Sequence, residues 1–165
     1  MSVIAAKVTP EYISVAADSI LIKEEMKRTT NFPKLIQVNN MIVGGAGCAE
    51  ELSLFQRFVT EKKPRAASIE GIQDFMRDFD RWKESYTNST GIDNCYLLVF
   101  DNHLFEIDGM FVQEINDYTA IGDGEAYALT ALHLGFLTTE AVKVTCDLCA
   151  SVSEPIVEYI VTKES

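Results

Sequence analysis

The start of the chain carries a residue that could act as a nucleophile without help from a histidine. Ser2 follows the initiator Met1, and cells usually remove Met1 when the next residue is small, which would give Ser2 a free α-amine. An α-amine has an ordinary pKa of about 7.7–8.0, so it can act as general base for the hydroxyl of the same residue. Neither His103 nor His133 lies near an obvious Ser or Cys nucleophile motif. The sequence therefore indicates Ser2 as the candidate nucleophile.

Two charged residues are expected to lie close to Ser2 in the fold. Residues 2–8 and 12–17 are typical of strands joined by a turn at 9–11, so the hairpin returns Asp18 beside the start of the first strand. A further strand, 34–38, opens with Lys34. A cation beside the serine lowers the pKa of its hydroxyl and favours the neutral amine, and an aspartate would hold that cation in place. Taken singly, Asp18 could close a turn and Lys34 could be a solvated strand end, but together the three residues favour catalysis.

Two later segments continue this pattern. Residues 41–49 (MIVGGAGCA) place a glycine-rich turn before a helix, and residues 120–128 (AIGDGEAYA) form a second glycine-containing turn. With Ser2, Asp18 and Lys34 in matching order and spacing, the chain resembles the proteasome β-type N-terminal nucleophile hydrolases, and most closely the bacterial HslV peptidases. The resemblance covers nearly the whole chain and ends near Asp147.

The resemblance implies a peptidase and assigns roles to particular residues. Catalytic roles are implied for Ser2, Asp18, Lys34, Gly47, Asp123 and Asp147. A backbone N–H near a helix N-terminus can face a developing oxyanion, and the resemblance places that donor at Gly47. The implied pocket for the residue before the scissile bond consists of Leu21, Phe32, Gly44 and Cys48. None of these carries a charge, and Gly44 at the pocket floor would leave room, so we expect a preference for large apolar residues.

Two departures from the family pattern keep other functions open. The family nucleophile is usually threonine, and the family's Gly-Ser-Gly segment is here Gly122-Asp123-Gly124. A non-catalytic proteasome-like ring subunit is therefore the main alternative, and an amidase acting on small amides is a third hypothesis. For the peptidase, the resemblance implies polypeptide substrates, homo-oligomeric stacked rings of dodecameric type, an ATP-dependent unfoldase as partner, and no cofactor.

The composition limits the possible partners and the compartment. The chain has 165 residues, 47% of them hydrophobic, and a formal net charge of −11, so we expect a single globular domain over 1–165. The negative charge argues against binding to nucleic acid. No apolar run is long enough to span a membrane and no signal peptide is visible, which predicts a cytoplasmic protein.

The four cysteines are Cys48, Cys95, Cys146 and Cys149. Without an export signal they are expected to be free, buried thiols. The pair at 146 and 149 has no second pair and no nearby histidine, so the sequence predicts no metal site.

The order of the predicted elements indicates a layered fold. Strands at 41–44, 95–100, 103–107, 110–115, 118–121 and 156–161 join those named above, with two-residue turns at 39–40 and 101–102. Amphipathic helices are predicted at 48–62, 68–84, 125–134 and 138–152, the last capped by Thr138. Two packed antiparallel sheets with a helix pair on each outer face would bury every apolar stripe. The prediction is an α+β fold, a four-layer αββα sandwich.

Overall fold

The computed structural model describes residues 2–23, 26–29, 32–150, 152 and 154–163. In the two short strands β3 (Ile20–Lys23) and β4 (Met26–Thr29) it describes the backbone alone. These strands pair with each other as a separate hairpin, which the sequence did not predict.

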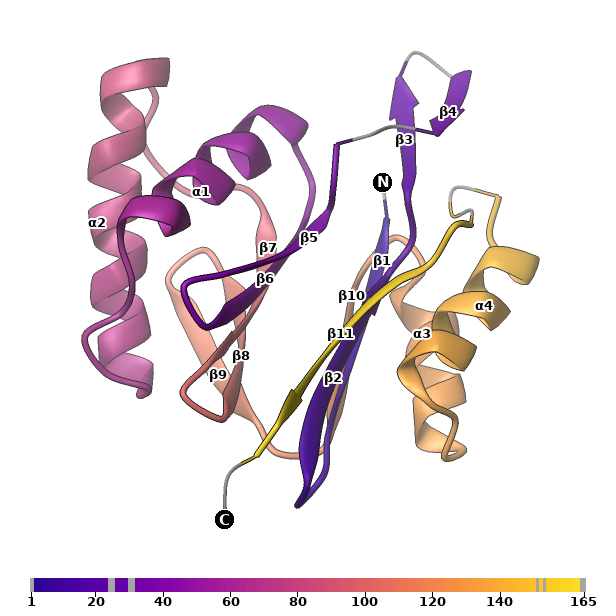
Figure 1. Cartoon of the computed structure of the whole chain (residues 1–165). Coiled ribbons are helices and arrows are strands. Elements are labelled where there is room, and N and C mark those ends of the chain that lie inside the picture. Colours follow the sequence, from indigo (N-terminus) through magenta and orange to yellow (C-terminus); the bar gives the residue numbers. More distant parts are fainter. Residues whose placement is uncertain (1, 24–25, 30–31, 151, 153, 164–165) are drawn as a thin grey trace.

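Two antiparallel sheets lie face to face, and a pair of helices covers the outer face of each (Figure 1). The first sheet has the order β10-β1-β2-β11 and consists of β10 (Tyr118–Gly122), β1 (Val3–Val8), β2 (Tyr12–Ala17) and β11 (Val157–Thr162). The second sheet runs in order from β5 to β9 and consists of β5 (Leu35–Val38), β6 (Met41–Ala46), β7 (Cys95–Phe100), β8 (His103–Asp108) and β9 (Phe111–Ile115). The predicted four-layer αββα sandwich is confirmed.

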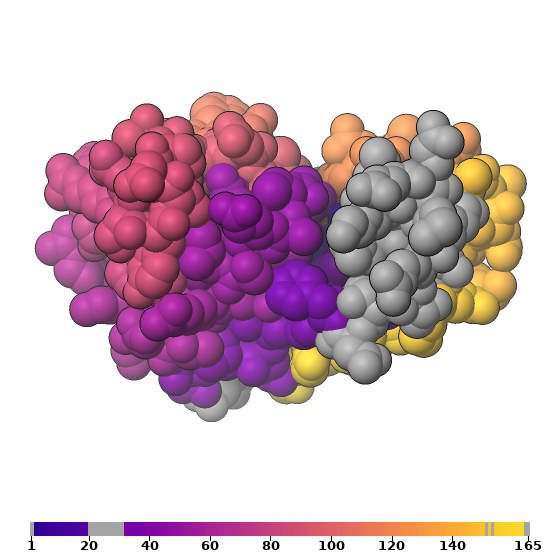
Figure 2. All heavy atoms as spheres, turned by 90° about the horizontal axis from the view of Figure 1, so that it is seen from above, coloured from indigo at the N-terminus to yellow at the C-terminus, as the bar shows by residue number. Residues whose placement is uncertain are grey.

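The helices form the two outer layers. Helices α1 (Ala49–Glu61) and α2 (Ile69–Thr87) cover the second sheet, whereas α3 (Glu125–His133) and α4 (Thr138–Leu148) cover the first. Seen from above, the two helix pairs lie on opposite sides of the molecule, α1 and α2 in purple to pink and α3 and α4 in orange to yellow (Figure 2).

Three apolar layers hold the sandwich together. Alternate side chains of each strand point to opposite faces, so every sheet contributes to two layers. Between the sheets, Ile4 and Leu97 are buried in one cluster. Phe55 and Phe79 fill the layer beneath α1 and α2. The layer beneath α3 and α4 contains small residues such as Ala128, which allow the helices to lie close to the sheet.

The predicted turns have the required backbone. Asn39 and Asn40 have φ of +50° and +61°, and Asp101 and Asn102 have φ of +49° and +65°. These are the left-handed conformations that two-residue hairpin turns need and that Asn and Asp tolerate. The strand after the first turn is longer than predicted, because β6 continues to Ala46.

Three expectations were wrong, two for the last helix and one for the cysteines. Leu137, not Thr138, is the N-cap of α4: its N–H donates to the Glu140 carboxylate at 2.9 Å. The Thr138 hydroxyl is instead directed inward to Glu158 at 2.8 Å, and the helix ends at Leu148 rather than at Val152. The four cysteines are free, but none is buried: Cys48 is exposed, and Cys95, Cys146 and Cys149 are partly exposed.

Among the described residues, no helix combines the length and the apolar character needed to cross a membrane.

Candidate active site

A buried ion pair joins the first two strands to the start of β5. Lys34 Nζ lies 3.1 Å and 3.2 Å from the two carboxylate oxygens of Asp18. The side chains of Lys34 and Asp18 are 6% and 0% exposed, so water does not screen the pair. The Gly45 N–H donates to the Lys34 carbonyl at 3.2 Å, which fixes the backbone of Lys34 to β6. The sequence prediction that Asp18 and Lys34 come together is therefore correct.

Asp18 also reaches the residue that follows Ser2. The Val3 N–H donates to Asp18 Oδ1 at 3.0 Å, and the Asp18 N–H donates to the Val3 carbonyl at 3.3 Å. Ser2 itself is buried, while Met1 lies outside the described residues. The start of β1, which N marks in Figure 1, is thus held beside the ion pair.

Gly122 closes the other side of Ser2. Its φ of +101° favours glycine, and a Cβ at this position would lie 2.0 Å from the Ser2 carbonyl oxygen. The turn that begins at Gly122 carries Asp123, whose side chain is exposed. The glycine therefore lets the turn between β10 and α3 approach the candidate nucleophile.

The electrostatics of the site centre on Lys34. Burial lowers the pKa of the Lys34 amine from its ordinary value, and the negative charges of Asp18 and Asp123 act in the opposite direction. Cys146 of α4 lies near enough to interact electrostatically with the pair, and burial raises the pKa of its thiol to about 11, followed by the effect of Asp18. Cys146 is therefore a neutral thiol beside the site at pH 7, a position that the sequence analysis did not predict.

A cavity of about 140 Å³ adjoins the ion pair. It is lined by Asp18 and Lys34, by their neighbours in the chain, and by the first residue of β11. The lining residues are Ala17, Asp18, Ser19, Phe32, Pro33, Lys34, Leu35 and Val157. Of the four residues expected to bind substrate, Phe32 lines this cavity.

The glycine turn after β6 faces the side chain of Asn94. Gly47 has a φ of +132°, and a Cβ there would lie 2.3 Å from Asn94 Oδ1, so both the backbone and the contact require glycine. Asn94 Oδ1 accepts the Cys48 N–H at 2.7 Å. Because the Cys48 N–H is already used, the neighbouring Gly47 N–H is the better candidate donor to an oxyanion.

The other residues expected to contact substrate lie in different surroundings. A Cβ on Gly44 would lie 3.0 Å from Ile4 Cδ1 and 3.1 Å from Leu35 Cδ1, so Gly44 faces the interface between the sheets. A role of Gly44 in the substrate pocket stays a prediction. Cys48 is exposed at the start of α1. The side chain of Leu21 lies outside the described part of the structure.

Asp147 does not contact the ion pair among the described residues. Its carboxylate lies 3.1 Å from Lys143 Nζ, one helical turn earlier, and its side chain is 60% exposed. A direct catalytic role for Asp147, as implied by the resemblance, has no support from this position.

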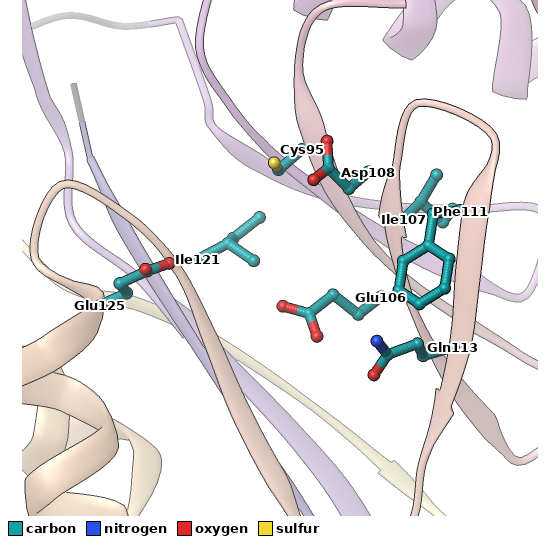
Figure 3. Close-up of a pocket in the computed structure, with 8 residues that line it drawn as sticks. All are labelled: Cys95, Glu106, Ile107, Asp108, Phe111, Gln113, Ile121 and Glu125. Atoms are coloured by element: carbon teal, nitrogen blue, oxygen red, sulfur yellow. The ribbon is translucent and has the colours of Figure 1, made fainter.

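A second cavity, of about 230 Å³, lies between β8–β9 and the β10–α3 turn (Figure 3). Glu106, Asp108 and Glu125 line it together with Cys95, and none of the predicted site residues does. Burial, followed by the charge of Asp108, raises the pKa of Cys95 to about 11, so its thiol is protonated at pH 7 and is a weak nucleophile. Burial also raises the pKa of Glu106. Among the described residues there is no cluster able to hold a metal ion.

The comparisons with known proteins agree with this architecture. No protein-family model and no curated protein sequence matches the chain. A solved structure of Thiobacillus denitrificans BPH in complex with epoxomicin superposes with a TM-score of 0.87 at 16% identity, covering 99% of this chain and 100% of that one. A second BPH structure from the same organism gives 0.85 at 18% identity, with 97% of each chain covered.

Eukaryotic HslV from Trypanosoma brucei is also similar, with a TM-score of 0.70 at 17% identity over 98% of this chain and 99% of that one. At these identities the likeness concerns the fold. The chain has the fold of the proteasome-like N-terminal nucleophile hydrolases.

Proposed function

We propose that the chain is an N-terminal nucleophile peptidase in which Ser2, exposed by removal of Met1, attacks the peptide bond. The observation that carries this proposal is the bridging position of Asp18, which is hydrogen-bonded to Val3 N–H and ion-paired with Lys34. A purely structural hairpin would not need a buried lysine at this place, because burying a charged pair costs desolvation energy. Through Asp18, the Lys34 amine is linked to the backbone of Val3, the residue that follows Ser2. Without Met1, Ser2 would carry both a hydroxyl and a free α-amine.

The proposed mechanism needs no group from outside the chain except water. The Ser2 hydroxyl oxygen bonds to the substrate carbonyl carbon while its proton passes to the Ser2 α-amine, directly or through a water. The Gly47 N–H donates to the oxyanion that forms. The α-amine then gives the proton to the leaving nitrogen as the C–N bond breaks, which leaves an ester on Ser2. Water hydrolyses this ester by the same sequence of steps.

Lys34 would act through its charge and its position. A cation near the serine stabilises the developing alkoxide and keeps the α-amine neutral, so that it can accept a proton. Burial lowers the pKa of Lys34, which makes its own ammonium easier to deprotonate. Asp18 would orient the Lys34 amine and keep it largely charged.

Asp123 favours the alternative function, a non-catalytic ring subunit. Its negative charge raises the pKa of Lys34. Asp123 also lies in the turn that approaches Ser2, where a carboxylate would stabilise the ammonium form of the Ser2 amine. An ammonium cannot act as a general base. A chain of this fold could therefore keep the ion pair for structure and have no peptidase activity.

The proposed substrates are polypeptides with an uncharged, apolar residue before the scissile bond. Phe32 lines the cavity next to the ion pair, and burying an apolar side chain there gains about 25 cal/mol per Å². A substrate arginine or glutamate would lose hydration without gaining an oppositely charged partner of its own, because Asp18 and Lys34 already neutralise each other. Fluorogenic peptides ending in Leu, Tyr, Arg or Glu, compared at equal concentration, test this preference, and small amides in the same assay test the amidase alternative.

We also propose a homo-oligomer of stacked rings, with an ATP-dependent unfoldase as its partner. Exposed apolar side chains gather at the connection between α3 and α4, where Leu134, Phe136 and Leu137 are 69%, 40% and 50% exposed. Such exposed apolar residues mark surfaces that a partner can cover. Light scattering at micromolar concentration should give a mass several times that of the 18.4 kDa chain. A monomeric mass would contradict the ring.

The decisive experiment measures the mass of the intact protein before and after treatment with epoxomicin. We expect a chain without Met1 and a single adduct, because an epoxyketone presents two electrophilic carbons to a residue with both a hydroxyl and an amine. Ser2→Ala also allows Met1 removal but lacks the hydroxyl, so it should show no adduct. Ser2→Thr is the positive control. A wild-type chain that loses Met1 but neither forms the adduct nor cleaves peptides would support the non-catalytic alternative.

A further inference from the structure

Asn94 clamps the peptide next to the proposed oxyanion donor. Its side chain is in contact with both backbone groups of Cys48: Oδ1 accepts the Cys48 N–H at 2.7 Å and Nδ2 donates to the Cys48 carbonyl at 2.9 Å. Asn94 is 1% exposed, so water does not compete for these contacts. The Leu52 N–H donates to the same carbonyl at 3.1 Å, which ties this peptide to the first turn of α1.

Gly47 packs directly against this amide. The Cβ that any other residue would carry at position 47 would lie 2.3 Å from Asn94 Oδ1 and 2.8 Å from its Cγ. The orientation of the Gly47–Cys48 peptide therefore depends on where the Asn94 side chain lies. The Gly47 N–H belongs to the preceding peptide, Ala46–Gly47, which meets the Gly47–Cys48 peptide at the Gly47 Cα. A displacement of Asn94 that moves this Cα would therefore also change the direction of the N–H.

Glu51 in turn fixes Asn94. Its carboxylate accepts the N–H groups of Asp93 and Asn94 at 2.8 Å and 3.0 Å, and the hydroxyl of Tyr96 at 2.8 Å. Burial, followed by the charge of Glu51, raises the pKa of Tyr96, so its hydroxyl remains a donor at pH 7. Three donors around one buried carboxylate allow little movement of the segment that carries Asn94.

The position of Glu51 in α1 makes this arrangement distinctive. Cys48 is the N-cap and Glu51 is the third helical residue, the position from which a Glu side chain usually reaches back to the N-cap N–H in a capping box. Here Asn94 accepts that N–H instead, and Glu51 holds Asn94. The usual local cap is replaced by a contact with a residue more than 40 positions away, directly before β7. Capping of α1 alone would not require this long-range contact, because Glu51 could accept the Cys48 N–H directly.

We infer that Asn94 is a positioning residue, held by Glu51, which aims the Gly47 N–H at the substrate oxyanion. This inference rests on the proposed peptidase function and deepens it. The side chain of Asn94 does not touch the reacting atoms. It acts through the Cα of Gly47 and the Gly47–Cys48 peptide, which directly follow the peptide that carries the Gly47 N–H. Preorganised donors of this kind give the transition state more stabilisation than the bound substrate.

The test compares Asn94→Ala with a control that removes similar contacts elsewhere on the same helix. Asn39 Nδ2 donates to the Val59 and Thr60 carbonyls near the end of α1, at 3.1 Å and 3.0 Å. Asn39→Gly removes these bonds and tolerates the positive φ of this position. Both variants should lower the melting temperature. The intact mass of both variants should show that Met1 has been removed, which leaves Ser2 with a free α-amine.

The kinetic constants separate positioning from stability. We expect Asn94→Ala to lower kcat about 30- to 100-fold with KM within about threefold, because an oxyanion donor acts in the transition state. Asn39→Gly should leave both constants within about twofold. Asn94→Asp keeps the acceptor for the Cys48 N–H but loses the donor to its carbonyl, so its kcat should fall between the two.

The outcomes distinguish this inference from the function on which it rests. An active wild-type protein whose Asn94→Ala variant keeps its kcat would overturn the inference alone, and Asn94 would then only cap α1. If the wild-type protein forms no epoxomicin adduct and cleaves no peptide, both the inference and the proposed peptidase function are overturned. A fall in kcat that is equal in the Asn94→Ala and Asn39→Gly variants would also contradict a positioning role.

Discussion

Asp18 and Glu51 are both buried carboxylates beside the candidate site, but the protein stabilises their charges differently. Asp18 has a cation, Lys34, at 3.1 Å. Glu51 is 7% exposed and has no ion pair among the described residues, and it accepts hydrogen bonds from two backbone N–H groups and one hydroxyl. The contact of Asp18 with Lys34 depends on the charge of both partners, whereas the three donors to Glu51 carry no charge.

This difference separates two tasks within one site. Around Asp18 the electrostatics are adjustable, since burial lowers the pKa of Lys34 while Asp18 and Asp123 raise it. Around Glu51 the contacts fix a peptide geometry through Asn94. The nucleophile side can thus be tuned by charge and the proposed oxyanion side by position. Variants of the two sides should differ in how stability, kcat and pH dependence respond.

The largest effect is expected from Lys34→Ala. It should abolish turnover and also lower the free energy of unfolding by about 3–5 kcal/mol, because it leaves a buried carboxylate without its cation. The Asp18 side chain is 0% exposed, so water cannot solvate the charge that would remain. Chemical denaturation and peptide hydrolysis measure the two effects.

A double variant separates the charge pair from the fold. Lys34→Met with Asp18→Asn removes both charges while keeping similar volumes, so most of the lost stability should return. Turnover should stay absent. Recovery of activity in the double variant would show that the ion pair has no part in catalysis.

The sequence predicts the Asp18 side of the site much better than the Glu51 side. The hairpin of residues 2–8 and 12–17 brings Asp18 back beside Ser2, and the resemblance adds Lys34, which reaches Asp18 from the start of β5 in the other sheet. The contact of Glu51 with Asn94 joins the first turn of α1 to the residue before β7, across 43 positions. Periodicity shows that Glu51 belongs to a helix. It does not reveal that the Glu51 carboxylate binds the backbone of Asn94 rather than the N-cap of its own helix. A Glu three residues after Cys48, where a capping box would place it, was the available signal.

Other details escaped prediction for related reasons. The β3–β4 hairpin stands apart from both sheets, so no pairing with the main strands could indicate it. A Cβ on Gly44 would point toward Ile4 in the facing sheet, a contact that the sequence does not reveal. Such packing between distant segments is a tertiary property that a single sequence does not display.

The Glu51 side is probed by Glu51→Gln, for which we expect a smaller effect. One of the three donors would then face an amide N–H₂ group, and an unsatisfied buried donor costs about 1–3 kcal/mol of the free energy of unfolding. We expect kcat to fall about tenfold while the pH profile of activity keeps its midpoint. A displaced midpoint would show that the charge of Glu51 reaches the nucleophile, and the distinction between the two carboxylates would fail. Tyr96→Phe, combined with it in a double-mutant cycle, measures the coupling of this pair.

On the nucleophile side of the site, around Asp18 and Lys34, we expect Asp123→Ser to cause a modest change in the pH dependence of activity. The negative charge of Asp123 raises the pKa of Lys34, so its removal lowers that pKa further and should act on the Ser2 amine in the same direction. The neutral amine then forms at lower pH, and the rise of activity should move toward lower pH. At neutral pH we expect a gain of about two- to fivefold, reduced by salt because Asp123 is exposed.

Glu125→Gln provides the matched control for this pH experiment. Glu125 lies two residues after Asp123, but its charge acts on Glu106 and Cys95 in the cavity of Figure 3. The control should leave the pH profile unchanged. Equal shifts in both variants would point to a general effect of net charge, and no shift in either would show that Asp123 does not influence the amine.

The smallest effect is expected from Asp147→Ala, although the resemblance implies a catalytic role for this residue. The Asp147 carboxylate pairs with Lys143 on the surface of α4, and exposed pairs at this spacing contribute little to stability. We expect kcat and KM within about threefold of the wild-type values and an unchanged pH profile. Asp74→Ala, which removes another exposed carboxylate paired with Arg65 at 2.9 Å, is the matched control. A loss of turnover in Asp147→Ala alone would place α4 in the catalytic machinery. The nucleophile side of the site would then extend from Asp18 past Cys146 to the end of this helix.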